Sequence, residues 1–326
     1  MQLTLNSVVL LVAVSGYGDV DEAGHPSWAE RDVHLWTNAV RVQPDAFQRE
    51  YQLGGCSMAV FSQDEQTPKG LVYYAAALNQ VAREHSVDMA TNSFFSHSSS
   101  DGTAMVDRVA PVYGSRMVSE NIARGYPDPK DAVLSGWMCS TSGHRANIMN
   151  GAWSELGAGV SGDFYTQNFG GKSIYAPGPV AMGNHTPEMP ATTVDFYADW
   201  QDDAPPKTLQ VVLDGEPTDL THVYGETDRG VYTGRALVDE TLSCHAYYFR
   251  WIDADDFVGG FPQDGSYLFG DCPDDAVMWR SEQQNFFTDA GEDGREAGCS
   301  ALTGSVGVAG LLVSVLGALR RRRRTL

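Results

Sequence analysis

Basic residues are scarce in this sequence. Its 326 residues include 22 Lys and Arg against 42 Asp and Glu, which gives a formal net charge of −20. Five of the basic residues form one run at positions 320–324, so the rest of the chain carries −25. Such an acidic body repels nucleic acid and anionic lipid headgroups. We therefore expect no nucleic-acid partner, whereas cations and basic surfaces remain open as partners.

Several patterns of common functional sites are also missing. The sequence contains no CxxC or zinc-finger spacing, no HExxH zinc-hydrolase pattern and no GxSxG nucleophile elbow. The two common hydrolase arrangements are thereby excluded. The apolar content of 42% and charged content of 20% are ordinary for a folded protein, which excludes disorder throughout. The length corresponds to about two domains.

The N-terminus resembles an export signal. Residues 7–16, SVVLLVAVSG, form a short apolar stretch followed by small residues, as in the apolar region and cleavage zone of a signal peptide. No Lys or Arg precedes it. We predict a signal peptide at residues 1–18, with a buried N-terminal strand as the alternative.

The C-terminus combines an apolar stretch with basic residues. Residues 301–319 are uncharged and would rise about 28 Å as a helix, close to the thickness of the hydrocarbon core. The basic run at 320–324 follows and predicts a cytoplasmic end. With Gly298, Cys299 and Ser300 before the span, residues 298–326 resemble the C-terminal sorting signals of myxobacterial surface proteins. That resemblance implies processing near Cys299 and surface delivery with transient membrane contact; a permanent transmembrane anchor is the alternative.

Cysteine usage agrees with export. Four of the five cysteines lie in the body of the chain and the fifth is Cys299. Three pairings of the four are possible, and the pairing that keeps each bridge within one proposed domain joins Cys56 to Cys139 and Cys244 to Cys272. An exported Cys139 with such a partner is expected to be oxidised rather than to serve as a nucleophile.

Helices are predicted in the first half of the chain. Residues 19–69 form an N-terminal segment with a helix at 38–47 that leads into a domain core at 70–170. From Leu71 to Met89 the apolar positions recur every three or four residues, which indicates an amphipathic helix with one buried face. Asp128 and Pro129 supply a cap and a first-turn proline for a helix to about residue 138, with Ala132, Val133 and Trp137 inward.

Strands are predicted to follow. Residues 157–160 and 164–169 form two strands around a tight turn, so the first domain is mixed α/β. Residues 171–191 are rich in Gly and Pro and are interpreted as a linker. Alternating runs at 192–197, 209–213 and 245–251 predict a small all-β, sandwich-like domain over residues 192–292.

Three residues of the first half could carry chemistry. His97, Glu120 and His144 are separated by 23 and 24 residues, so only a tertiary fold can bring them together. Their surroundings, FFSHSSSDGT, Arg108, SENIARGY, GWMCSTSGHRANIMN, ELGAGV and YTQNFG in that order, resemble the bacterial branch of the CAP superfamily of cysteine-rich secretory, antigen 5 and pathogenesis-related proteins. The resemblance covers about residues 70–170.

This resemblance implies an α-β-α sandwich with a central cleft. Two histidines and two glutamates form its floor in animal and plant members. His97 and His144 match the two histidines and Glu120 matches one glutamate. Ser140 stands where the second glutamate would lie, three residues after Trp137. Mechanisms that need two carboxylates are therefore in doubt.

The chemistry of these side chains leaves three functions open. His97 and His144 as neutral imidazoles are predicted ligands of a weak Zn²⁺ site completed by water, with Glu120 orienting one ring. The same cleft could bind a lipid, a small apolar ligand or a cell-surface partner, as the resemblance implies. A metal-assisted hydrolase with Glu120 or a histidine as general base, and a structural or adhesive surface protein, are the alternatives. We favour binding without turnover over catalysis.

The remaining candidates have simpler explanations. His85 lies on the apolar stripe and is expected to be a buried core residue, and Glu155 is expected to open a strand. Asn121 and Asn147 are expected to fix local backbone turns. A group of carboxylates in the second domain could offer oxygens to Ca²⁺ but lacks EF-hand spacing, so a solvated acidic rim is favoured. Its members are Asp253, Asp255, Asp256, Asp264 and Asp271.

Overall fold

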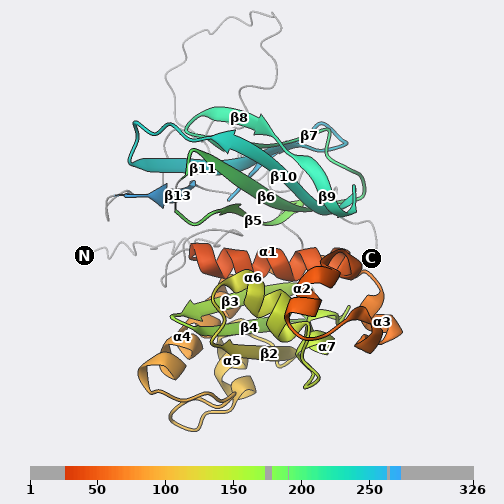
Figure 1. The fold of residues 1–326 in the computed structure, drawn as a ribbon, viewed down its shortest axis with the longest axis vertical. Coiled ribbons are helices and arrows are strands. Elements are labelled where there is room, and N and C mark those ends of the chain that lie inside the picture. The colour runs from red at the N-terminus through yellow and green to blue at the C-terminus, as the bar shows by residue number, and fades with distance from the viewer. Residues whose placement is uncertain (1–25, 173–177, 190, 263–264, 273–326) are drawn as a thin grey trace, which may run out of the picture. The chain divides into compact units, whose positions relative to one another are not determined.

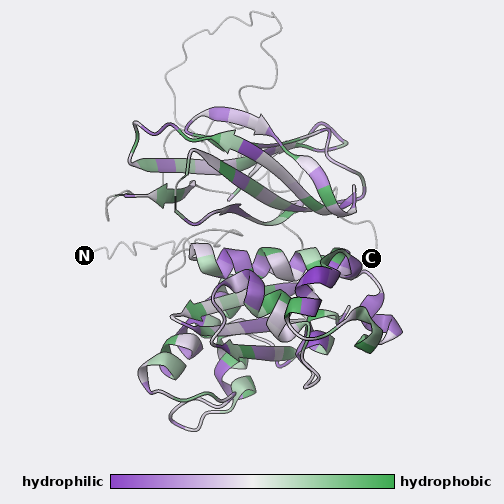
Figure 2. Ribbon diagram, viewed as in Figure 1, coloured by the Kyte–Doolittle hydropathy of each residue, from purple (hydrophilic) through white to green (hydrophobic). Residues whose placement is uncertain are grey.

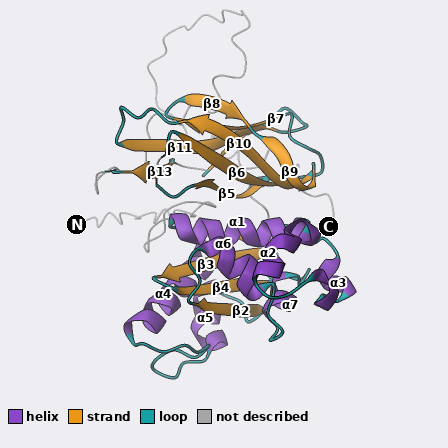
Figure 3. Ribbon diagram, in the orientation of Figure 1, coloured by secondary structure: helices purple, strands orange, loops and turns teal. Residues whose placement is uncertain are grey.

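A computed structural model describes residues 26–172, 178–189, 191–262 and 265–272, all within one compact unit (Figure 1). The predicted signal peptide at 1–18 and the tail at 298–326, with Cys299 and the span at 301–319, lie outside these residues, and both stay predictions. Within the described ranges no helix has the length and apolar character needed to cross a membrane. All helices of the described chain belong to its first half, and strands occur in both halves (Figure 3).

The first domain is built around one four-stranded sheet. Its strands are β1 (Tyr73–Tyr74), β2 (Val118–Arg124), β3 (Glu155–Ser161) and β4 (Phe164–Gly170), in the order β1-β3-β4-β2. Only β1 and β3 run parallel. Helix α4 (Ala76–Thr91) packs across β3 and β4 on one face, and α1 (Trp28–Val42) packs against β3 from the other (Figure 1). This is the α-β-α layering that the sequence predicted.

Shorter elements complete the first domain. A 3₁₀ turn, η1 (Pro44–Phe47), follows α1, and Pro44 at its start marks the break between them. Helix α5 contacts α4 and β2, and α7 contacts β2. The other short elements are α2 (Gln48–Leu53), the 3₁₀ turn η2 (Met58–Val60), α3 (Gln63–Gln66), α5 (Met105–Tyr113) and α7 (His144–Ile148).

Close packing of α4 on the sheet depends on two glycines. A Cβ atom at Gly157 would collide with the α4 backbone at Asn79, and one at Gly159 would collide with it at Ala82. The buried face of α4 carries Leu78, Val81, His85 and Met89, as the periodicity predicted. The glycines of β3 thus allow α4 to lie directly against this strand of the sheet.

The helix predicted from Leu71 starts later than expected. Residues 71–75 are extended up to the start of α4, and Tyr73 and Tyr74 pair with Glu155 and Leu156 in β3. Leu71 and Tyr74 are buried, as a helical stripe would require, but Val72 between them is fully buried too. A short apolar run that is buried on both faces is consistent with a buried strand, and the three-residue spacing of Leu71 and Tyr74 concealed it.

The helix predicted at 38–47 begins earlier. Helix α1 starts at Trp28, where Ser27 and Glu30 form a reciprocal capping box, and it ends at Val42. The helix predicted from Asp128 is confirmed: the Asp128 side chain accepts the amide of Asp131 at 2.8 Å. Helix α6 (Pro129–Asp131) continues into a π-helical segment, η3 (Ala132–Trp137), whose Ala132, Val133 and Trp137 are buried.

The second domain consists of two antiparallel sheets. The first has the order β5-β6-β10-β9; the second has the order β12-β11-β7-β8, with β13 also paired to β11. Both contribute to one core that is rich in aromatic rings, including Phe196, Trp200, Tyr247 and Phe249. Figure 2 shows apolar and polar segments alternating along these strands. The strands are β5 (Val180–Thr186), β6 (Thr193–Gln201), β7 (Thr208–Leu213), β8 (Glu216–Asp219), β9 (Thr221–Glu226), β10 (Arg229–Leu237), β11 (Cys244–Ile252), β12 (Val258–Phe261) and β13 (Tyr267–Gly270).

The predicted linker at 171–191 contains the first of these strands. Residues 180–186 form β5, which pairs with β6, and Val180, Ala181 and Met182 are buried. The linker interpretation is therefore wrong for this stretch. The surrounding Gly and Pro residues concealed a short apolar strand that is buried by its neighbours.

Helix α1 is buried against strands of both domains. Asn38 donates to the carbonyl of Val72 at 3.0 Å on one side and to Asp199 Oδ2 on β6 at 2.6 Å on the other. Arg31 donates to Asn184 Oδ1 on β5 at 3.1 Å. Burial raises the pKa of the Asp199 carboxyl well above its ordinary value, although the hydrogen bond from Asn38 opposes this shift. The second domain thus covers a polar face of a helix that belongs to the first.

Candidate functional site

Glu120 lies at the centre of the candidate site. It occupies the middle of β2, and its side chain is 1% exposed. Its Oε1 lies 2.9 Å from His97 Nδ1, and its Oε2 accepts from Arg108 at 2.5 Å. With its amide oriented to satisfy both neighbours, Asn168 on β4 also donates to Oε2 at 3.1 Å. Both carboxylate oxygens are therefore engaged by protein groups.

His97 is held at the rim by this carboxylate. It lies in the loop between α4 and α5, and its side chain is 53% exposed. Arg108 on α5 steadies the same loop by donating to the carbonyl of His97 at 3.1 Å and to Ser99 Oγ at 3.0 Å. Because Nδ1 faces an acceptor, it carries a proton, and the lone pair of the neutral ring is on Nε2. His97 thus presents Nε2 away from Glu120.

His144 begins α7, which contacts β2. Burial lowers the pKa of the His144 imidazole, and the electrostatic effect of nearby His97 lowers it further, which favours the neutral ring near pH 7. The contact of α7 with β2 and the hydrogen bond between His97 and Glu120 place His97, Glu120 and His144 in one region of the fold.

Asn121 and Asn147 tie α7 to the sheet. Asn121 donates to the carbonyl of His144 at 3.1 Å, and Asn147 donates to Asn121 Oδ1 at 2.8 Å and to the carbonyl of Glu120 at 3.3 Å. The prediction that these asparagines fix local turns is wrong, because they join segments more than 20 residues apart. They position His144 relative to Glu120.

Ser140 supports a turn. Its Oγ accepts the amide of Ser142 at 3.0 Å, and its carbonyl accepts from Arg145 at 3.2 Å. The hydroxyl at the position of the missing glutamate therefore helps to shape the loop before His144.

The donor set suits only an open metal site. Among the described residues no three or more His, Cys, Asp or Glu side chains gather as a metal-binding group. Glu120 has both oxygens committed, so His97 Nε2 and the His144 ring are the available protein ligands. Two imidazoles can hold Zn²⁺ only where water or a bound ligand completes the coordination.

Two site residues were missed by sequence reasoning. Arg108 pairs with Glu120, and Asn168 is a second donor to Oε2 of the same carboxylate. Arg108 stood within the ordered motifs but was not assigned a role. Glu120 itself could have indicated such partners, because a carboxylate that is buried in a strand requires a cation or several hydrogen-bond donors.

Comparison with known proteins agrees with this architecture. Residues 37–174 match the family described as CAP, the cysteine-rich secretory protein family. These residues form a CAP domain. The membrane protein YlbC of Bacillus subtilis is 40% identical over 91 residues, which span 28% of this chain and 26% of YlbC. The protein YkwD of the same organism is 36% identical over 109 residues, which span 29% of this chain and 37% of YkwD.

A solved structure shows a similar relationship. An extracellular protein containing a SCP domain from Bacillus anthracis shares 32% identity over 41% of this chain and 43% of that chain, with a TM-score of 0.30. The chain therefore spans less than half of the length of each of these three relatives.

The predicted disulfides are confirmed. Cys56 bonds to Cys139 within the CAP domain, and Cys244 bonds to Cys272 within the second domain. Cys139 is thus not a free nucleophile. His85 is a buried residue of α4 and Glu155 opens β3, also as predicted.

The acidic group of the second domain divides into separate roles. Asp253 accepts backbone amides of Asp255 and Phe257 in its own turn, and Asp256 pairs with Lys207 at 2.5 Å. Asp264 lies outside the described residues. The Asp253 interactions are those of a turn, which agrees with the favoured acidic rim.

Proposed function

We propose that this chain is an exported surface protein whose CAP domain binds a ligand in the cleft of His97, Glu120 and His144, without turnover. The ligand is a divalent metal ion such as Zn²⁺, or a polar group that completes the coordination of such an ion. Residues 298–326, with Cys299 and the span at 301–319, would direct the chain to the surface or anchor it there.

Export is supported by the two disulfides. Such bonds persist in oxidising compartments and are rare in the cytosol. The Bacillus anthracis relative is described as extracellular, which agrees with this location. The predicted signal peptide at 1–18 would provide the route.

The proposal rests mainly on the way Glu120 presents His97. A buried carboxylate that accepts Nδ1–H fixes the ring orientation and the tautomer and makes the other nitrogen a better ligand. The second imidazole, His144, stays neutral by burial and is therefore able to bind a metal. His97, Glu120 and His144 are all polar, which favours a metal ion or polar ligand over a lipid.

The same contacts argue against catalysis by Glu120. A general base must reach the water that it activates. Glu120 instead accepts from His97, Arg108 and Asn168, so its oxygens are turned to protein groups. Ser140 supplies no second carboxylate. The carboxylate therefore suits an orienting role better than proton transfer.

Metal binding tests the proposal directly. We expect the purified full chain to bind added Zn²⁺ in a calorimetric titration and to lose this binding in the His97→Ala/His144→Ala variant. His222→Ala, which removes an exposed imidazole of β9, serves as the matched control and should bind as the parent protein does. Equal binding by the double variant, or no binding by the parent, contradicts the proposal.

Turnover is tested on the same preparations. Hydrolysis of peptide or ester substrates that disappears in Glu120→Gln, while the variant unfolds with an unchanged denaturant midpoint, would show an enzyme instead. The proposal expects no activity that depends on Glu120.

A further inference from the structure

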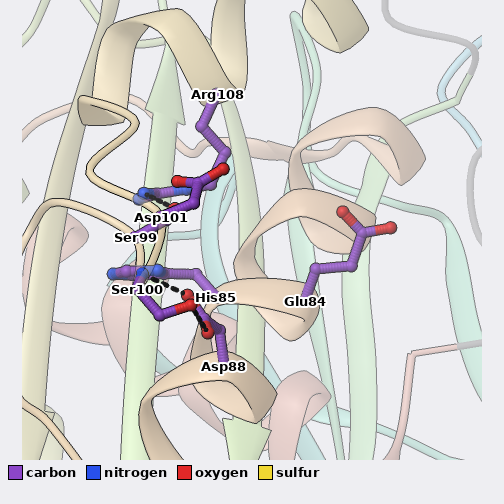
Figure 4. A pocket seen from close by; sticks show the side chains of 7 residues that line it. All are labelled: Glu84, His85, Asp88, Ser99, Ser100, Asp101 and Arg108. Carbon is purple, nitrogen blue, oxygen red and sulfur yellow. Dashed lines mark hydrogen bonds between the residues drawn. The ribbon is translucent and has the colours of Figure 1, made fainter. Parts of the chain in front are cut away.

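A pocket of about 300 Å³ with polar lining residues opens beside α4 (Figure 4). Glu84, His85 and Asp88 of α4 line one side, and Ser99, Ser100 and Asp101 of the following loop line the other, with Arg108 above them. His97, Glu120 and His144 are not part of its lining. The pocket is thus separate from the cleft described above and shares only Arg108 with it.

The charge of the pocket is negative. Glu84, Asp88 and Asp101 contribute three carboxylates, whereas the single guanidinium, that of Arg108, is paired with Glu120. Burial alone would raise the pKa of Asp88, but hydrogen bonds from Ser100 and Asn92 lower it below its ordinary value. The amide and hydroxyl of Thr103 lower the pKa of Asp101. Asp88 and Asp101 are therefore anionic at neutral pH.

A buried acceptor completes this lining. His85 is 1% exposed, and its Nε2 lies 2.9 Å from the carbonyl of Ser96, so Nε2 must carry the proton. Burial also lowers the pKa of His85 and keeps the ring neutral. Its Nδ1 is then a lone-pair acceptor, and this buried atom has no hydrogen-bond partner. Such an atom is destabilising unless a donor reaches it.

These features favour a ligand with several N–H donors rather than a single ion. No three of the potential metal ligands among the described residues converge on one point. Both oxygens of Asp88 already accept from Ser100. The acceptors are instead spread over the walls of a pocket at the lower end of the size range of small-molecule sites.

We propose that this pocket binds an alkylammonium or guanidinium group, either on a free amine or on a basic side chain of a peptide. The carboxylates of Glu84 and Asp101 attract the cation at the mouth. An N–H of the ligand donates to His85 Nδ1. This site goes beyond the function proposed for the cleft and does not depend on it.

Calorimetric titration of the full chain in EDTA tests the site. We expect saturable binding of 1,5-diaminopentane and of N-acetyl-lysinamide, and at least tenfold weaker binding of N-acetyl-norleucinamide, the neutral analogue of similar size. Tighter binding of the lysinamide than of the diamine would identify a peptide side chain as the source, and the reverse would identify a free amine. Equal binding of the norleucinamide overturns the proposal.

Two double variants test whether lysinamide binds in this pocket. Glu84→Gln/Asp101→Asn removes two exposed charges with little change in shape and should weaken lysinamide binding at least tenfold. Glu226→Gln/Asp228→Asn removes the same two charges at an exposed turn of the second domain and should change it less than twofold. Equal losses in both pairs would show non-specific attraction to an acidic protein and overturn the site.

The acceptor and the cleft are tested separately. His85→Phe should weaken lysinamide binding further, provided that its denaturant midpoint shows a folded protein; if it does not fold, the carboxylate pair alone decides. His97→Ala/His144→Ala should bind lysinamide as the parent does. Loss of binding in that variant would assign the amine to the cleft and contradict a separate pocket.

Discussion

The two halves of the described chain bury different chemistry. The CAP domain buries hydrogen-bonded polar groups, such as Glu120, Asn121 and Gln167, beside its apolar core. The second domain buries a cluster of aromatic rings around Phe196 and Tyr247. The first half therefore depends more on hydrogen bonds between buried polar groups, and the second depends more on filled volume. Substitutions in the two halves should fail for different reasons.

Removal of the disulfides should give the largest losses of stability in the two halves. Replacing both members of a pair by Ser removes a cross-link across 83 residues for Cys56–Cys139 and 28 for Cys244–Cys272. Chain entropy predicts upper losses in the free energy of unfolding of about 4.5 and 3.5 kcal/mol respectively. Urea denaturation measures both losses, with the oxidised parent protein, in which both bonds are intact, as the reference. A larger loss for the shorter loop would contradict the prediction.

Phe196→Ala tests the aromatic core. Phe196 is fully buried and contacts the rings of Tyr247 and Phe269. The cavity should lower the free energy of unfolding by about 4 kcal/mol. Phe257→Ala is the matched control because Phe257 is 51% exposed, and it should cost less than about 1 kcal/mol. Similar urea midpoints for the two variants would show that filled volume does not stabilise this half.

Arg108→Met tests the polar half. It leaves the carboxylate of Glu120 buried without its cation and should lower the free energy of unfolding by about 3 kcal/mol. Adding Glu120→Gln removes the unpaired charge and should recover part of this loss. Arg116→Met removes an exposed ion pair with Asp107 and should cost less than about 1 kcal/mol. No recovery in the double variant would mean that charge pairing is not the cause.

Asp199→Asn tests a buried carboxyl at the contact between the two halves. Burial raises the folded pKa of Asp199 above its ordinary 3.8, so its stabilising contribution is complete below that pH and is lost as the pH rises through the raised value. Between pH 3.8 and the raised pKa, the free energy of unfolding of the parent protein should fall by about 1.4 kcal/mol per pH unit relative to that of the variant. Other titrating groups are common to both proteins and cancel. Parallel pH–stability curves contradict the prediction.

Local patterns predicted much of the CAP domain. The Asp128 cap, the buried face of α4 and the β3–β4 hairpin follow from neighbours within a few residues. The ordered motifs also indicated the association of His97, Glu120 and His144. The strand at 73–74 and the strand at 180–186 were missed, because each is too short to show a period and is defined by the partner that buries it.

Contacts between distant segments could not be predicted. Asn38 and Asp199 are 161 residues apart, and neither residue type indicates burial by itself. The pairing of Arg108 with Glu120 needs the loop, α5 and β2 to be placed first. Sequence periodicity reports which face is apolar, but it does not report which polar groups will meet inside.

The burial of α1 has a consequence for dissecting this protein. Arg31, Asp32 and Asn38 are buried, and each hydrogen-bonds to Asn184 or Asp199 of the second domain. A fragment that stops at Lys172 would expose this helix to water and strip it of those partners. An expression plan for the N-terminal half should therefore include the β-rich half, because that half supplies the hydrogen-bond partners of α1.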